Sequence, residues 1–257
     1  MFVTTAGRTN EQMIDKARNV AETLDIPYIP RKKKSISQIQ KEAAGSCLIV
    51  GKERLELYNQ EHKEPFFFHP NSAMFRIKRL LNGEQDPFIE AADLSSGMSL
   101  LDCTLGLASD AIVAGFVVGF EGTVTGIEGQ KYLSFLVKEG LQSWDSGYLE
   151  INSAMKRIKV NTTFSLDYLK SQPSSSIDCV YFDPMFEESI HESDGIKSLG
   201  YFALRYDLNE ETISEALRVC KRKVILKDHY KSQRFEKYGF TVFRRKTAKF
   251  HFGILEK

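Results

Sequence analysis

The sequence predicts an α/β protein whose central sheet is mostly parallel and ends in an antiparallel hairpin, with a small α/β appendage at the N-terminus. From about residue 98, short apolar runs alternate with segments whose apolar residues recur at helical spacing, which is typical of βαβ units. Near the C-terminus, residues 239–246 and 248–257 form two alternating segments with no helical pattern between them. Two strands without a crossover helix must pair antiparallel, so the sheet is expected to finish in a hairpin.

The strands and helices are expected in the order that βαβ units require. The expected strands are short and rich in apolar residues, and they lie at 98–106, 122–129, 158–164, 177–186 and 223–228. Helical spacing and helix-terminal charges predict helices at 109–119, 133–144 and 209–222. Ser109 is the expected N-cap of the first of these helices.

The N-terminal residues form a different block. The segment 1–7 reads as a strand, and the segment 10–25 as an amphipathic helix, with further strands within 46–59. We therefore expect a small α/β region over residues 1–69 and a main domain over residues 70–257. A short helix that follows the boundary carries three basic residues, Arg76, Lys78 and Arg79.

The composition, 42% hydrophobic and 27% charged residues, is that of a soluble globular protein. No apolar stretch approaches the roughly 20 residues of a membrane span, so no membrane association is expected. The first residues lack the charged leader and apolar segment of a signal peptide, and we expect a cytoplasmic protein. Because the net charge is only +1, a nucleic-acid partner would need a local basic face. The basic run 31–34 is one candidate, and a solvated charge run is the alternative.

Cysteines and histidines give no indication of a metal site. The cysteines lie far apart and mostly in apolar runs, which predicts reduced, buried thiols at Cys47, Cys103, Cys179 and Cys220. The sequence has no CxxC pair and no HExxH motif.

Residues 100–111 combine a carboxylate at a strand end with a glycine in the turn that opens a helix. Gly106 lets backbone amides approach a ligand closely, and Asp102 and Thr104 precede it. Glu128 ends the next strand, where an acid can accept both ribose hydroxyls of a nucleoside. The turn lacks a GxGxxG motif for pyrophosphate, and its carboxylates suit the ammonium and sulfonium of S-adenosylmethionine. The alternative is that Asp102 and Glu128 are solvated strand ends.

The turn after the third strand offers a further contact to a nucleoside. Phe164, Ser165 and Asp167 follow that strand, where side chains can meet the ring and edge of adenine. The alternative is a core phenylalanine and a helix-capping serine.

Asp183, Pro184, Met185 and Phe186 follow the fourth strand, where open α/β sheets bind ligands. The nitrogen of an aromatic amine or an amide is a poor nucleophile, and it needs acceptors that hold its hydrogens while a methyl carbon approaches. The Asp183 carboxylate and the Pro184 carbonyl can supply two acceptors, and Phe186 can stack on a flat base. The alternative is an Asp-Pro turn that ends a strand, with Met185 and Phe186 packed on the core.

Around these motifs the sequence resembles the bacterial ribosomal small-subunit RNA (guanine-N2)-methyltransferase family, whose class I sheet ends in the same hairpin. The similar blocks fall within residues 70–257, at 76–94, 100–111, 180–186, 220–230 and 248–254. The resemblance implies S-adenosylmethionine as cofactor, held by Ser109, Asp110, Glu128, Gly129, Phe164, Ser165 and Asp183. It implies RNA contacts at Arg76, Lys78 and Arg79, and catalysis at the four residues 183–186.

Three departures from the family are present, and the second and third bear on the substrate. Ala108 replaces the second glycine of the first turn, and Glu187 replaces the proline after the active-site aromatic residue. Five acids and no Lys or Arg lie between Asp183 and Asp194, where the family is basic, and acids repel a phosphate backbone.

We therefore expect an S-adenosylmethionine-dependent methyltransferase that acts on an exocyclic base nitrogen of RNA. Guanine N2 of ribosomal RNA is the favoured target. A non-catalytic RNA-binding or assembly factor is one alternative. Methylation of a small molecule or of a protein glutamine is the other.

Overall fold

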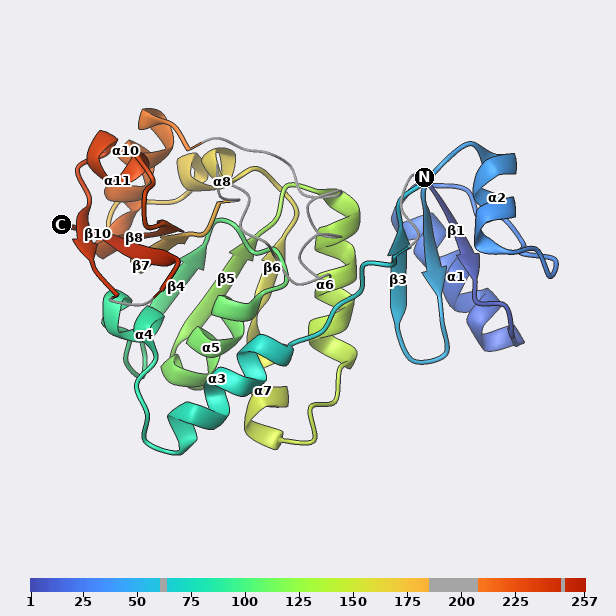
Figure 1. The fold of residues 1–257 in the computed structure, drawn as a ribbon, viewed down its shortest axis with the longest axis horizontal. Coiled ribbons are helices and arrows are strands. Elements are labelled where there is room, and N and C mark those ends of the chain that lie inside the picture. The colour runs from blue at the N-terminus through green and yellow to red at the C-terminus, as the bar shows by residue number, and fades with distance from the viewer. Residues whose placement is uncertain (61–63, 185–207, 246–247) are drawn as a thin grey trace.

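The computed structural model describes residues 1–60, 64–184, 208–245 and 248–257 (Figure 1). Its larger sheet has seven strands in the order β6-β5-β4-β7-β8-β10-β9. In chain order these strands are β4 (Ser99–Asp102), β5 (Thr123–Ile127), β6 (Lys159–Asn161), β7 (Ile177–Phe182), β8 (Cys220–His229), β9 (Thr241–Phe243) and β10 (Phe250–Glu256). β10 pairs antiparallel with both β8 and β9, and the other pairs are parallel. The predicted fold class is confirmed.

The strand order reverses between β4 and β7. From β4 the chain proceeds outward through β5 and β6, and it then returns to the other side of β4 to form β7 and β8. Asp102 at the end of β4 is in register with Gly126 of β5 and with Tyr181 of β7. The carboxyl ends of β4, β5 and β7 therefore meet at one edge, at the point where doubly wound sheets form their ligand crevice.

Helices cover both faces of this sheet (Figure 1). Leu100 and Leu101 of β4 point to opposite faces and belong to different core clusters. The Leu100 face carries α3 (Asn71–Leu81), α4 (Pro87–Ala92), α5 (Ser109–Val118), α6 (Lys131–Ser143) and α7 (Leu149–Arg157). The Leu101 face carries α8 (Ser165–Ser171), α10 (Glu210–Val219) and α11 (Arg234–Lys237).

At two helix boundaries the structure shows why the observed end differs from the predicted one. Ser109 is the first residue of α5 and not its N-cap, which is Ala108 in a left-handed conformation with φ 61°. The Ala108 amide donates to the Leu105 carbonyl at 2.7 Å, so a tight turn through Gly106 brings the chain into the helix without a side-chain cap. At the other boundary, α10 ends at Val219 and β8 begins at Cys220, because Cys220 pairs with Ile177 in the sheet.

The N-terminal region holds a three-stranded sheet in the order β1-β2-β3, formed by β1 (Phe2–Thr5), β2 (Cys47–Val50) and β3 (Leu55–Tyr58). The predicted helix is α1 (Glu11–Thr23), and a second helix that was not predicted is α2 (Ile36–Ala43). The signal for α2 is a capping box. The Ser35 hydroxyl accepts from the Gln38 amide at 3.2 Å, and the Gln38 side chain accepts from the Ser35 amide at 2.8 Å.

One apolar cluster joins the two sheets. It contains Val3 and Leu57 of the smaller sheet together with Leu136 of α6, which packs on the larger sheet. Phe68 packs edge-on against Trp144, and it lies so close to Gly140 that a Cβ there would be 2.2 Å from its ring. The division of the chain at residue 69 stays a prediction.

All four cysteines lie in the described residues, and all four are buried thiols, as the sequence predicted. Burial raises the pKa of Cys47 to about 12 and that of Cys179 to about 11, so both thiols stay protonated near neutral pH. Among the described ranges, no helix combines the length and the apolar character needed to span a bilayer.

Gly126 of β5 has no room for a side chain, because a Cβ there would lie 2.4 Å from Leu105 Cδ1. We expect Gly126→Ala to lower the free energy of unfolding by ~1–3 kcal/mol in urea denaturation, since overpacking displaces Leu105. In a Leu105→Ala background the same change should cost less, because the overlapping atoms are gone. Equal losses in both backgrounds would contradict this packing.

Candidate active site

The structure brings three of the predicted residues into direct contact at the switch point, the sheet edge where the strand order reverses between β4 and β7. The Thr104 amide donates to the Asp102 carboxylate at 3.0 Å, and the Thr104 hydroxyl accepts from the Asp183 amide at 2.6 Å. The tips of β4 and β7 are thereby joined through one threonine side chain. The Asp183 backbone, which places the carboxylate and the following proline, is fixed relative to the first turn.

Asp102 is almost fully buried at 2% exposure. Burial raises the pKa of its carboxyl to about 8, although the Thr104 amide opposes that shift. A cation beside Asp102 would favour its ionised form, so this carboxylate is suited to an ammonium or sulfonium ligand.

Glu128 links the first turn to the end of β5. One carboxylate oxygen accepts from the Gly106 amide at 3.3 Å, and the other accepts from the Gln130 amide at 2.9 Å. Gly106 has φ 48°, a left-handed conformation that directs its amide toward Glu128. Burial raises the pKa of Glu128. Each carboxylate oxygen has a second lone pair, so the acid can also accept hydrogen bonds from a diol.

The remaining predicted cofactor residues lie along the same edge. Gly129 lies between Glu128 and Gln130, the N-cap of α6. Phe164 follows β6 and is 48% exposed, so the core role considered as an alternative is wrong. Ser165 is buried as the first residue of α8, whose N-cap is Phe164, so the capping role for Ser165 is also wrong.

Asp110, an expected cofactor contact, is bound by side chains of the protein itself. It is buried in the first turn of α5, and protein donors engage both of its oxygens. Arg76 Nη1 donates to Oδ1 at 2.5 Å, while Oδ2 accepts from the Tyr181 hydroxyl at 2.9 Å and from Lys227 Nζ at 3.2 Å. Burial alone would raise the pKa of Asp110, but Lys227 and Arg76 hold it below its usual range. Asp110 therefore anchors an internal ion-pair network.

Lys227 extends this network to Asp183, and sequence reasoning missed it. Its Nζ lies 2.7 Å from Asp183 Oδ2, so it joins that carboxylate to Asp110. Burial opposes its charge, but the two carboxylates raise the pKa of Lys227, which remains an ammonium. A lysine that directly follows the apolar run 224–226, two residues before the end of β8, was the available signal.

Arg76, an expected RNA contact, is likewise bound by side chains of the protein itself. Its guanidinium binds Asp86 through Nε at 2.7 Å and Nη2 at 2.8 Å, in addition to Asp110. Asp86 in turn accepts from the amide of Phe88 at the start of α4. These contacts commit Arg76 to holding α3, α4 and α5 together, which leaves it poorly placed to bind RNA.

The other two basic residues of α3 lie outward. The Lys78 ammonium is 4.7 Å from the Tyr148 ring centroid, and Arg79 forms an exposed ion pair with Glu84 at 2.8 Å. Both remain candidate RNA contacts.

Asp183 retains 27% exposure of its side chain, and Pro184 next to it is buried. Burial raises the pKa of Asp183 to about 6, against the lowering effect of Lys227. Asp183 is therefore mostly ionised at pH 7 and can accept a hydrogen bond. Met185 and Phe186, and the acidic segment that follows them, lie outside the described residues.

Residues 31–252 match a family model described as "Putative SAM-dependent methyltransferase". The chain belongs to this family. It is 48% identical over 255 residues to the Bacillus subtilis (strain 168) protein named "Uncharacterized protein YpiP", covering 99% of each chain. In fold it is similar to the SAM-dependent methyltransferase NGO1261 of Neisseria gonorrhoeae, with a TM-score of 0.64 and 16% identity over 100% of this chain and 96% of that one.

S-adenosylmethionine is the cofactor of this methyltransferase family, and the donor set at the switch point fits it. The site combines the buried carboxylate of Asp102 and the half-buried carboxylate of Glu128 with a turn whose glycine, Gly106, has φ 48°. These groups suit a cationic amino-acid tail and a ribose diol, and the exposed ring of Phe164 suits a purine face.

Arg76→Gln should lower the free energy of unfolding by roughly 3–5 kcal/mol at pH 7, because it removes the cation of the buried Asp86 carboxylate and one of the two cations of the buried Asp110 carboxylate. Arg79→Gln on the same helix is the matched control. It breaks an exposed pair, so a loss below about 1 kcal/mol is expected. Urea denaturation of both variants measures the difference, and similar losses would show that the Arg76 network is not a main determinant of stability.

Proposed function

We propose that this methyltransferase moves the methyl group of S-adenosylmethionine to an exocyclic amino nitrogen of an RNA base. The target that we favour is guanine N2 of ribosomal RNA. The observation that supports this most is the position of Asp183 and Pro184. They lie at the tip of β7 beside β4, where Thr104 and Lys227 fix the aspartate from two sides.

S-adenosylmethionine supplies an electrophilic methyl carbon on a positively charged sulfur. The residues of this chain have to hold an acceptor nitrogen in line with that carbon. A guanine amino group is delocalised into its ring and keeps two hydrogens, so it needs acceptors on both. The Asp183 carboxylate and the Pro184 carbonyl provide them, and neither has to form a covalent bond to the substrate. As the carbon–nitrogen bond forms and the carbon–sulfur bond breaks, the excess proton on the nitrogen leaves along the hydrogen bond to Asp183. Positioning and electrostatic complementarity then account for the rate.

Glu128 is proposed to bind the ribose hydroxyls of the cofactor, and Asp102 to balance its positive charge. Phe164 is proposed to lie against the adenine. The resemblance of residues 180–186 to RNA methyltransferases supports a base nitrogen as acceptor, and the outward cations Lys78 and Arg79 support a polyanionic substrate.

The central test has two arms. Isothermal titration should show binding of S-adenosylmethionine by the full-length protein. Purified protein with labelled cofactor should then transfer methyl groups to total RNA of a strain that lacks the protein, and nucleoside mass spectrometry should find a methylated guanosine missing from that strain. An Asp183→Asn variant that binds cofactor and RNA without transferring methyl groups would support the enzyme. An unchanged nucleoside profile would contradict an RNA substrate, and no cofactor binding at millimolar concentration would contradict methyl transfer.

The rate of methyl transfer should depend on the ionisation of Asp183. Its pKa is raised to about 6, so the acceptor form is lost as the pH falls through that value, and kcat/KM should decrease about tenfold per pH unit below it. Lys227→Met removes the group that lowers this pKa, so the midpoint should move to higher pH. Measuring kcat/KM for methyl transfer between pH 5 and 8 gives the midpoints for the wild type and for Lys227→Met. A profile that is flat across pH 6 would exclude Asp183 as the titrating acceptor.

Glu128→Gln should weaken binding of S-adenosylmethionine about tenfold, since a charge-assisted hydrogen bond contributes ~1.4 kcal/mol more than a neutral one. Glu121→Gln is the control, because Glu121 is exposed and precedes β5, at the opposite end of that strand. Calorimetric titration of both variants compares their affinities. Unchanged affinity in Glu128→Gln would remove this residue from the cofactor site.

A further inference from the structure

The C-terminal segment from His229 to His251 has a charge and composition unlike the rest of the chain. It contains seven Lys and Arg residues and one acid, Glu236, whereas the whole protein has a net charge of +1. One of these cations is internal, because Arg234 lies 2.9 Å from the buried carboxylate of Asp228. The same segment contains six Tyr and Phe residues. A basic surface with interspersed aromatic rings is typical of single-stranded nucleic-acid binding.

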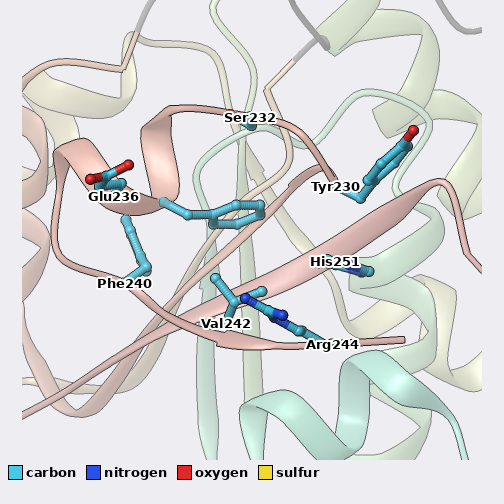
Figure 2. A pocket seen from close by; sticks show the side chains of 8 residues that line it. Tyr230, Ser232, Glu236, Phe240, Val242, Arg244 and His251 are labelled. Atoms are coloured by element: carbon cyan, nitrogen blue, oxygen red, sulfur yellow. The ribbon is translucent and has the colours of Figure 1, made fainter. Parts of the chain in front are cut away.

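Within this segment the structure has a pocket of about 560 Å³ between α11 and the β9–β10 hairpin (Figure 2). Its volume falls in the ~300–1,000 Å³ range of small-ligand sites. Phe240 and Val242 supply apolar lining, while Arg244 of the hairpin and Glu236 of α11 face it from opposite sides. Tyr230 stands at one end, 48% exposed, with its ring centroid 6.2 Å from that of His251. The pocket therefore combines a flat aromatic face, an apolar wall, a cation and one acceptor.

The pocket and the proposed catalytic residue lie at the same end of the sheet, on its opposite faces. Lys227, which binds Asp183, lies 5.1 Å from the Phe250 ring centroid on the Leu100 face, and Arg245 lies 4.7 Å from the same centroid. The pocket residues Phe235, Phe240 and Val242 lie in or pack against the core cluster of the Leu101 face. Tyr230 follows directly on β8, the strand next to β7. Because neighbouring strands lie about 4.8 Å apart and a strand rises about 3.3 Å per residue, the backbone of Tyr230 is within roughly 15 Å of that of Asp183, a few nucleotides along an RNA strand that passes the end of the sheet.

We propose that this pocket binds a nucleotide of the RNA substrate that flanks the methylated base. Its base stacks on Tyr230 against the apolar wall, Glu236 accepts a hydrogen bond from a base amino group or a ribose hydroxyl, and Arg244 and Arg245 contact the adjoining phosphates. The inference rests on the proposed function, since it assigns a second contact to the same RNA. It also places a positive surface beside the catalytic edge, where the acidic residues after Phe186 would otherwise repel phosphate.

The test uses the full-length protein and a fluorescein-labelled single-stranded RNA of about 12 nucleotides in fluorescence anisotropy. Tyr230→Ala should weaken binding about tenfold through the lost stacking, and Tyr230→Phe, which keeps the ring, should restore most of it. The double variant Arg244→Ala/Arg245→Ala should also weaken binding and reduce the slope of log K against log salt by about 1.4, the value for two phosphate contacts to a single strand. Lys16→Ala/Lys41→Ala is the matched control for charge, because both lysines are exposed, lie in the N-terminal region and belong to no candidate RNA contact.

Calorimetric titration with S-adenosylmethionine and thermal melting accompany each variant, so that loss of fold or of the cofactor site is recognised. Weaker RNA binding with unchanged cofactor affinity supports the inference. Unchanged RNA binding in the Tyr230 and Arg244/Arg245 variants, with methyl transfer by the wild type intact, overturns the inference and leaves the proposed function standing. Absence of RNA binding and of RNA methylation by the wild type overturns both.

Discussion

The buried carboxylate of Asp110 is the interaction on which the geometry of the site depends. It accepts from Arg76, Tyr181 and Lys227, so one side chain connects α3, α5, β7 and β8. A buried carboxylate is tolerated only when cations and hydrogen bonds compensate its desolvation, and here two cations do so. Because Lys227 also binds Asp183, the same network that fixes the helices against the sheet sets the position and the charge of the proposed catalytic acceptor.

The reversal of strand order explains why the functional carboxylates meet. Parallel strands present their carboxyl ends at one edge, and doubly wound sheets form their ligand crevice where the strand order reverses, here between β4 and β7. Thr104 joins the two strand ends, since its amide binds Asp102 and its hydroxyl accepts from the Asp183 amide, and the Gly106 amide binds Glu128 after β5. The cofactor side and the substrate side of the proposed reaction are thus built on adjacent strands.

Charge is distributed unevenly over a chain that is almost neutral overall. The edge that would hold a sulfonium is acidic, whereas the β9–β10 hairpin and the turn after β8 are basic and aromatic. For the RNA substrate proposed above, this separation places the carboxylates of the cofactor site and the phosphate contacts on different parts of the chain. It reconciles an RNA substrate with the acidic stretch after Phe186, since the phosphate contacts need not come from that stretch.

The sequence by itself determined the alternation of strands and helices, the antiparallel finish and the positions of Asp102, Glu128 and Asp183, because apolar periodicity and strand-end residues are local signals. It missed α2, α4, α7 and α11 and offered a helix at α8 only as an alternative, because these helices are short and depend on capping or on packing against the sheet. Only the tertiary structure decided the roles of Arg76, Asp110 and Lys227. These residues lie up to 151 positions apart in the sequence, and whether a charge binds a ligand or another charge depends on which side chains folding places within about 3 Å of it.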